Sequence, residues 1–188
     1  MRNLVDPADL VRLTQLTAAA MERATVAVEE ADVALADDVV AGSVRLDRSR
    51  GDLARQLSTA LVARAPAVPV LATIHALTEL ERMSGLVLHV ARAVQRAYPQ
   101  PVVPRESTPD FVELGRIAVW LAELAAGNGR VRSLISVEDD LADLRRILAR
   151  LQEHGEIAVL SRCYERFAGH AVRLGRLLDS AVPRNQAA

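Results

Sequence analysis

Residues 81–85 read Glu-Arg-Met-Ser-Gly, and residues 165–169 read Glu-Arg-Phe-Ala-Gly. Each copy lies inside a long stretch in which apolar residues recur at helical spacing, and the helical pattern continues beyond the glycine. Two copies of one phrase in a chain of 188 residues indicate two structurally related halves.

The glutamate of the first copy stands in an apolar stripe. At about 100° per residue, Glu81 shares a side of its helix with Val70, Ile74, Leu77, Ser84 and Leu88. A second stripe covers another side and consists of Leu80, Met83, Val87, Val90 and Val94. We therefore expect neighbours on more than one side of this helix and an inward-pointing Glu81. A buried carboxylate needs a partner, either an arginine from a neighbouring helix or a metal ion.

The composition is typical of an all-helical protein, with 51% hydrophobic and 3% aromatic residues and no stretch of strand-like alternation. The 23 basic and 24 acidic residues give a net charge of -1, so nothing in the charge favours nucleic acid or an anionic membrane as partner. The longest uncharged run, residues 65–78, is too short and too broken by proline to cross a bilayer. We expect any contact with a membrane to be made through a partner.

The single cysteine and the N-terminus predict a cytoplasmic protein. Cys163 lies among apolar residues and is expected to be a reduced core thiol rather than a nucleophile. The first residues lack the pattern of a signal peptide. The four histidines have no metal-ligand spacing, so structural or surface roles are expected for His75, His89, His154 and His170.

The pattern predicts six helices in two sets of three. Asp6 and Pro7 begin a helix at residues 7–30, and further helices follow at 32–64 and 68–97. A proline-rich linker follows, and Thr108 and Pro109 start a fourth helix that stops at residues 127–129, Gly-Asn-Gly. The last two are expected at 131–153 and 156–181. We therefore divide the chain into a first repeat at 1–98, a linker at 99–109, a shortened second repeat at 110–182 and a disordered tail at 183–188.

This arrangement resembles the PhoU family of phosphate-transport accessory proteins, whose members consist of two similar up-down three-helix bundles. The family phrase, Glu-Arg-Ile-Gly-Asp, falls in the third helix of each bundle, and its counterparts here begin with Glu81 and Arg82 and with Glu165 and Arg166. The proline-rich stretch also resembles the linker between bundles in one branch of the family. The resemblance covers nearly the whole chain.

The chain departs from the family phrase at its fifth position. The family's aspartate is replaced by Gly85 in the first copy and by Gly169 in the second, so each acidic pair has lost one carboxylate. Iron or zinc needs several ligands that converge from different helices, so we expect no retained cofactor, or at most a degenerate iron or zinc site. Glu81 and Glu165 are then expected to form ion pairs, and the glycines to let a neighbouring helix approach closely.

The resemblance implies a regulatory adaptor rather than an enzyme, and no phosphate loop, nucleophile elbow or zinc-protease motif occurs in the sequence. By resemblance, the protein is a negative regulator of phosphate uptake and phosphate-starvation signalling. Its implied partners are the ATPase subunit of the phosphate transporter and a sensor histidine kinase, and the role leaves room for a homodimer. Two alternatives stay open: a metal-binding bundle whose ion tunes partner affinity, and a diverged bundle with other partners.

Overall fold

The computed structural model describes residues 6–62, 66–128, 134–151 and 155–181, and every regular element in these ranges is helical. This confirms the predicted all-α fold. Most boundaries lie within three residues of the predicted ones, and the predicted tail at 183–188 lies outside the described residues. The helices, with a short π-helical turn η1, are α1 (Pro7–Glu30), α2 (Val33–Val62), α3 (Ala67–Ala97), α4 (Thr108–Glu123), η1 (Leu124–Asn128), α5 (Leu134–Arg150) and α6 (Glu156–Ala181).

The helix ends follow from local sequence. The carboxylate of Asp6 accepts a hydrogen bond of 2.9 Å from the backbone nitrogen of Ala8, and Pro7 occupies the first helical position. Gly127 and Gly155 have φ values of 87° and 92°, which favour glycine, and they separate α4 from α5 and α5 from α6. The N-cap of α4 is Ser107, so the helix starts one residue earlier than expected.

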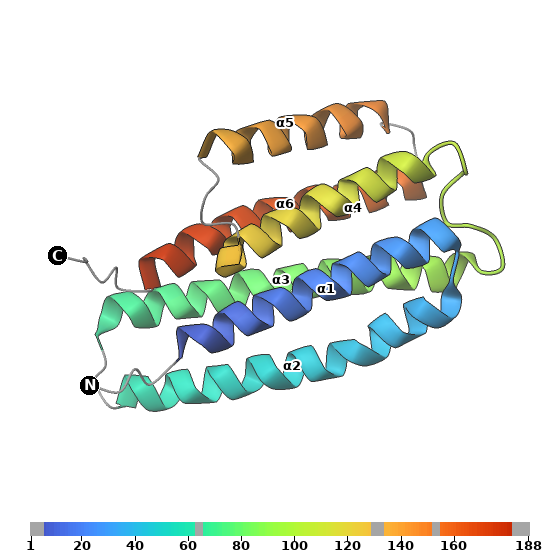
Figure 1. The fold of residues 1–188 in the computed structure, drawn as a ribbon. Helices are drawn as coiled ribbons and strands as arrows, with labels where there is room; N and C mark the ends of the chain where they lie inside the picture. Colours follow the sequence, from blue (N-terminus) through green and yellow to red (C-terminus); the bar gives the residue numbers. More distant parts are fainter. Residues whose placement is uncertain (1–5, 63–65, 129–133, 152–154, 182–188) are drawn as a thin grey trace.

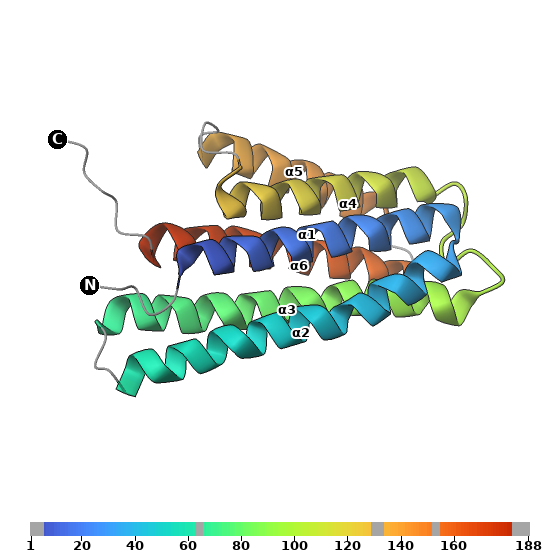
Figure 2. The same cartoon turned by 60° about the horizontal axis from the view of Figure 1, so that its bottom comes forward.

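Helices α1 to α6 run alternately up and down, and α1, α3, α4 and α6 lie at the centre (Figures 1 and 2). Among these central helices, the most extensive contacts are those of α3 with α6 and of α1 with α4. On one side α2 covers α1 and α3, while on the other α5 lies against α4 and α6. The division into repeats at 1–98 and 110–182 stays a prediction.

One hydrophobic core runs through both sets of helices and takes buried side chains from all six. Its largest side chains include Phe111 of α4 and Tyr164 of α6, whose rings meet edge to face at 6.0 Å. The Tyr164 hydroxyl lies 3.3 Å from Oγ1 of Thr25 on α1, which itself donates to the carbonyl oxygen of Met21. Tyr164 therefore donates to Thr25, and helices α1, α4 and α6 meet in a satisfied polar contact within an apolar centre.

The close helix approach occurs at a glycine outside the repeated phrase. A Cβ atom placed on Gly115 of α4 would lie 2.4 Å from Cγ2 of Thr25, so α1 contacts the α4 backbone directly. A Cβ atom on Gly85 or Gly169 would meet nothing within 4 Å. The packing role predicted for the two phrase glycines is therefore wrong, because each of them faces open space.

The hairpin formed by α2 and α3 leaves large apolar side chains exposed where the two helices meet, namely Leu61, Val62, Val68 and Leu71. Among the described residues, no helix combines the length and the apolar character that a membrane span requires. The end of the α2–α3 hairpin is therefore a small exposed apolar surface.

Candidate functional site

The first copy of the phrase lies on the surface. The Glu81 side chain is 65% exposed, and its carboxylate is 3.9 Å from the guanidinium of Arg50 on α2. The expected inward orientation is wrong, although the ion pair with an arginine of a neighbouring helix is present in weak form. Leu77 and Leu80 lie on the buried face of α3, and Glu81 lies beside that face on the exposed side of the helix. Ile74, from the predicted stripe, is likewise exposed.

The second copy is also exposed. Glu165 and Arg166 both point outward from α6, so the inward orientation expected for Glu165 is wrong too. Within the described ranges Glu165 takes part in no ion pair, in contrast to the expectation that it would be reused in one. The buried residues on either side are Tyr164 and Phe167, which face the core and leave the Glu-Arg pair on the opposite side of the helix.

The buried carboxylate of α3 belongs to Glu79, two residues before the phrase. Its side chain is only 10% exposed, and it is surrounded by basic groups of α6. Its Oε2 lies 2.6 Å from Nδ1 of His170 and accepts a hydrogen bond of 3.1 Å from Nε of Arg173. Its Oε1 accepts a hydrogen bond of 3.2 Å from Arg82. We name Glu79, Arg82, His170 and Arg173 the α3–α6 junction.

Burial and charge act against each other in the junction. Burial alone raises the pKa of Glu79, but the hydrogen bonds from His170 and Arg173 outweigh it, so the carboxyl pKa lies below its ordinary value. Burial lowers the pKa of His170, and the hydrogen bond to Glu79 offsets this only in part. At neutral pH the junction therefore holds an ionised Glu79, a neutral imidazole and two guanidinium groups.

The imidazole is shared between two partners. Nδ1 of His170 lies 2.6 Å from Glu79 Oε2 and 2.6 Å from Nη2 of Arg173. A neutral ring nitrogen either donates or accepts a proton in a hydrogen bond, so Nδ1 bonds the carboxylate in one tautomer and the guanidinium in the other. The junction can thus exchange a bond between Glu79 and Arg173 without moving a helix.

A hollow opens beside the junction, between α5 and α6. The second copy of the phrase lines it, through Glu165, Arg166 and Gly169, together with His170 and Arg173 one turn further on. From α5 it receives Leu141, Leu144 and Arg145. The hollow is open to solvent, and basic side chains outnumber acidic ones in its lining.

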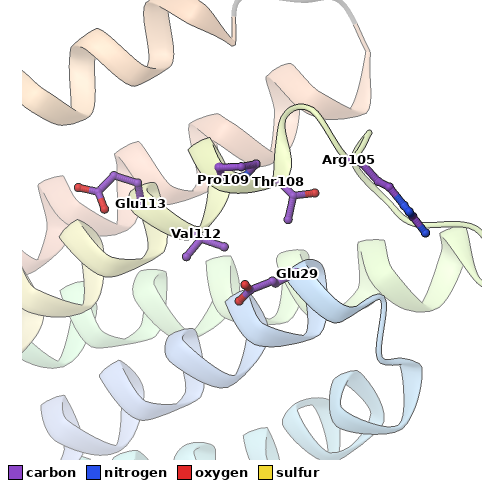
Figure 3. Close-up of a pocket in the computed structure, with 6 residues that line it drawn as sticks. All are labelled: Glu29, Arg105, Thr108, Pro109, Val112 and Glu113. Carbon is purple, nitrogen blue, oxygen red and sulfur yellow. The ribbon is translucent and has the colours of Figure 1, made fainter.

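A second hollow lies between the end of α1 and the start of α4 (Figure 3). Its charged side chains do not converge, because the ends of Arg105 and Glu113 point away from one another (Figure 3). Glu113 is held by two hydrogen bonds of 2.8 and 2.6 Å from Arg116 of the same helix. This hollow offers no common point at which several groups could hold one ligand.

Histidine and acidic side chains do not assemble into a metal centre in the part of the chain that the structure describes. No three His, Cys, Asp or Glu residues of these ranges lie close enough together to hold an ion. His75 and His89 are exposed on α3, and His154 lies outside the described residues. Cys163 is buried, as predicted, and burial raises the pKa of its thiol to about 11.

Sequence reasoning chose the wrong glutamate because two apolar stripes bracket the phrase. The signal for Glu79 was present, since it shares a helix face with Ala72, Ala76 and Met83, all of them buried. Small residues on one face mark the side where another helix comes close, and α6 packs there. A glutamate within that small-residue face is therefore the one to expect at an interhelical contact.

The fold defines the class of the protein, an up-down helical bundle (Figure 1), and in this chain α3 and α6 meet through the charged side chains of the junction. The protein-family model of the PhoU domain matches residues 10–94 of this chain. A crystal structure of PhoU from Pseudomonas aeruginosa shares the fold, with a TM-score of 0.70, 17% identity, and coverage of 90% of this chain and 91% of that one.

Curated relatives place the chain more narrowly. It is 33% identical over 181 residues to the "Phosphate-specific transport system accessory protein PhoU homolog 2" of Mycobacterium tuberculosis, covering 86% of this chain and 85% of the relative. It is 31% identical over 192 residues to the corresponding homolog 1 of Mycobacterium leprae, covering 89% and 84%. The chain belongs to the PhoU family, and the resemblance inferred from its two Glu-Arg phrases is confirmed.

Proposed function

We propose that this protein is a negative regulator of phosphate uptake and of phosphate-starvation signalling. It acts in the cytoplasm by contacting the ATPase subunit of a phosphate transporter and a sensor histidine kinase, and it has no catalytic activity of its own. The observation that carries the proposal is the similarity to proteins named as accessory proteins of phosphate transport, which extends over more than four fifths of both chains.

Features of the surface support an adaptor role. Long helices with polar outer faces offer contact surfaces to partner helices and grooves. The two hollows described above are open to solvent, whereas small-molecule enzymes bury most of a substrate in an enclosed pocket. Exposed apolar side chains at the end of the α2–α3 hairpin add surface of the kind found at protein contacts.

A deletion strain tests the regulatory role. Expression of a phosphate-responsive reporter is measured in high phosphate in three strains: the parent, the deletion strain, and the deletion strain that carries the gene on a plasmid. We expect high reporter expression only in the deletion strain, since loss of a negative regulator leaves the starvation response switched on. Equal, low expression in all three strains would contradict the proposal.

Partner contacts need their own measurement. The tagged protein is purified from phosphate-replete cells after mild crosslinking, and the transporter ATPase and the sensor kinase are sought by mass spectrometry, with an untagged strain as control. Enrichment of both supports the proposed contacts. Recovery of neither, while the reporter still responds to the deletion, would retain the regulatory role and reject these two partners.

A further inference from the structure

Three arginine side chains from two helices line the hollow between α5 and α6. Arg166, His170 and Arg173 are four and then three residues apart on α6, so they share one side of that helix. Arg145 reaches the same hollow from α5, and all four residues line it. The basic side chains thus line the hollow from two helices and do not merely follow one another along one helix surface.

The hollow carries an excess of positive charge. Glu165 is the acidic residue in its lining, against three guanidinium groups. In the described part of the chain, no ion pair joins Arg145 or Arg166 to a carboxylate, and Arg173 shares Glu79 with Arg82. The three guanidinium groups thus face two carboxylates, Glu165 in the lining and Glu79 paired with Arg173. This excess of positive charge disfavours a bound metal cation and favours an anion.

The lining of the hollow leaves room for a ligand at Gly169. Gly169 lies between Arg166 and Arg173 in the lining, and a Cβ atom on it would meet nothing within 4 Å. A small group can therefore reach the α6 backbone at this point with guanidinium groups on both sides. Planar guanidinium forks match the oxygen pairs of a tetrahedral oxyanion and bind them through charge-assisted hydrogen bonds.

We propose that the hollow between α5 and α6 binds a phosphate-type oxyanion, held by Arg145, Arg166 and Arg173 above Gly169. The binding of an oxyanion rests on the lining of the hollow, whereas the choice of phosphate as the ion to test rests on the proposed function. The same chemistry occurs in inorganic phosphate and in phosphate monoesters, so the experiment compares the two.

Binding would reach α3 through one shared side chain. Arg173 lines the hollow and also donates to Glu79 through Nε, so the same guanidinium would contact both the oxyanion and Glu79, and the anion would weaken its hold on Glu79. When the anion draws Arg173 away from Glu79, the hydrogen bond of His170 to the Glu79 carboxylate remains. A ligand at the phrase of the second set of helices would thereby change a contact with the first set.

Calorimetric titration of the purified full-length protein tests the proposal. Inorganic phosphate, phenyl phosphate and chloride are titrated at constant ionic strength into the native chain and into Arg145→Gln, Arg166→Gln and Arg12→Gln. Arg12 is an exposed arginine of α1 outside the hollow and serves as the matched control. Circular dichroism establishes that each variant is folded.

We expect saturable binding of phosphate to the native chain and to Arg12→Gln, and about tenfold weaker binding to each hollow variant, the loss usual for one charge-assisted hydrogen bond. Stronger binding of phenyl phosphate than of phosphate would indicate an ester as the ligand and would still support the site. No saturable binding, or an equal loss in Arg12→Gln, would overturn it.

The outcome is separable from that of the proposed function. Absence of binding, together with a reporter that still responds to the deletion, would remove the oxyanion site and leave the regulatory role. Binding together with an unresponsive reporter would remove the role and leave the site.

Discussion

Gly115 and Gly169 provide opposite tests of the packing. In Gly115→Ala the new Cβ lies 2.4 Å from Cγ2 and 2.5 Å from Oγ1 of Thr25, whereas carbon atoms in contact are normally about 3.5–4.0 Å apart. Thr25 is buried and held by its hydrogen bond to Met21, so it cannot rotate away without losing that bond. The helices α1 and α4 must separate instead.

Overpacking of a core costs about 1–3 kcal/mol, and an overlap above 1 Å belongs at the upper end of that range. Replacing a helical glycine by alanine returns about 1 kcal/mol of helix propensity. The net loss for Gly115→Ala is therefore about 2 kcal/mol, whereas Gly169→Ala, which faces open space, gains about 1 kcal/mol. At about 2–4 °C per kcal/mol, the melting temperature falls by about 4–8 °C in the first variant and rises by about 2–4 °C in the second.

Differential scanning calorimetry on the two variants, on Thr25→Ala and on Thr25→Ala/Gly115→Ala measures these shifts. The double variant removes Cγ2 and Oγ1, the two closest atoms, and leaves Cβ of residue 25 at 2.9 Å, so we expect Gly115→Ala to cost less in the Thr25→Ala background than in the native one. Equal melting temperatures for Gly115→Ala and Gly169→Ala would refute the close α1–α4 approach. Strict additivity in the double variant would refute the assignment of the clash to Thr25.

Three further outcomes follow from the junction and the core. Glu79→Gln should lower the free energy of unfolding by about 2 kcal/mol, because it removes the charge that two arginines and His170 contact. The exposed Glu81 is the control, and Glu81→Gln should change the free energy of unfolding by less than about 0.5 kcal/mol. Urea denaturation compares the two variants, and equal effects would contradict the assignment of Glu79 as the buried carboxylate. The pKa of His170 in the folded chain lies below its ordinary value of about 6.5, so the unfolded chain binds the proton first as the pH falls. The contribution of His170 to the free energy of unfolding is therefore complete above about pH 6.5 and is lost as the pH falls toward the folded-state pKa. The melting temperature should therefore fall between pH 7.5 and 5.5 in the native chain and in His75→Gln, and less steeply in His170→Gln; an unchanged slope in His170→Gln would argue against a buried neutral imidazole. Finally, the Cys163 thiol, buried and with a pKa of about 11, should react with a disulfide reagent at pH 8 only after denaturation, and fast labelling of the native chain would contradict its place in the core.

The fold was largely readable from the sequence because its signals are local. Asp6 and Pro7 begin α1 through a side-chain cap and a fixed φ, and Gly127 and Gly155 adopt positive φ values that few other residues adopt. The proline-rich stretch ended α3 for the same reason. Element type and order depend on such positions and on apolar periodicity, so they did not require knowledge of the packing.

The site was less readable because it depends on which helices meet. Glu79 and His170 lie 91 positions apart, and only the packing of α3 on α6 brings them together. Periodicity can place Glu81 near an apolar stripe, but it cannot tell the last covered position from the first exposed one, since that boundary is set by the neighbouring helix. The same uncertainty misplaced Glu165.

The two copies of the phrase, alike in sequence, have different surroundings for a structural reason. The first lies beside α2, a helix of 30 residues that places Arg50 next to Glu81 and leaves Gly85 facing open space. The second lies beside α5, a helix of 17 residues in the structure that packs on α4 and α6 and contributes Arg145 to the lining of the hollow. The second copy therefore adjoins a hollow in which Arg145 and Arg166 form no ion pair within the described ranges, while Arg173 is paired with Glu79. Any ligand that acts on the α3–α6 contact is therefore expected at the second copy and not at the first.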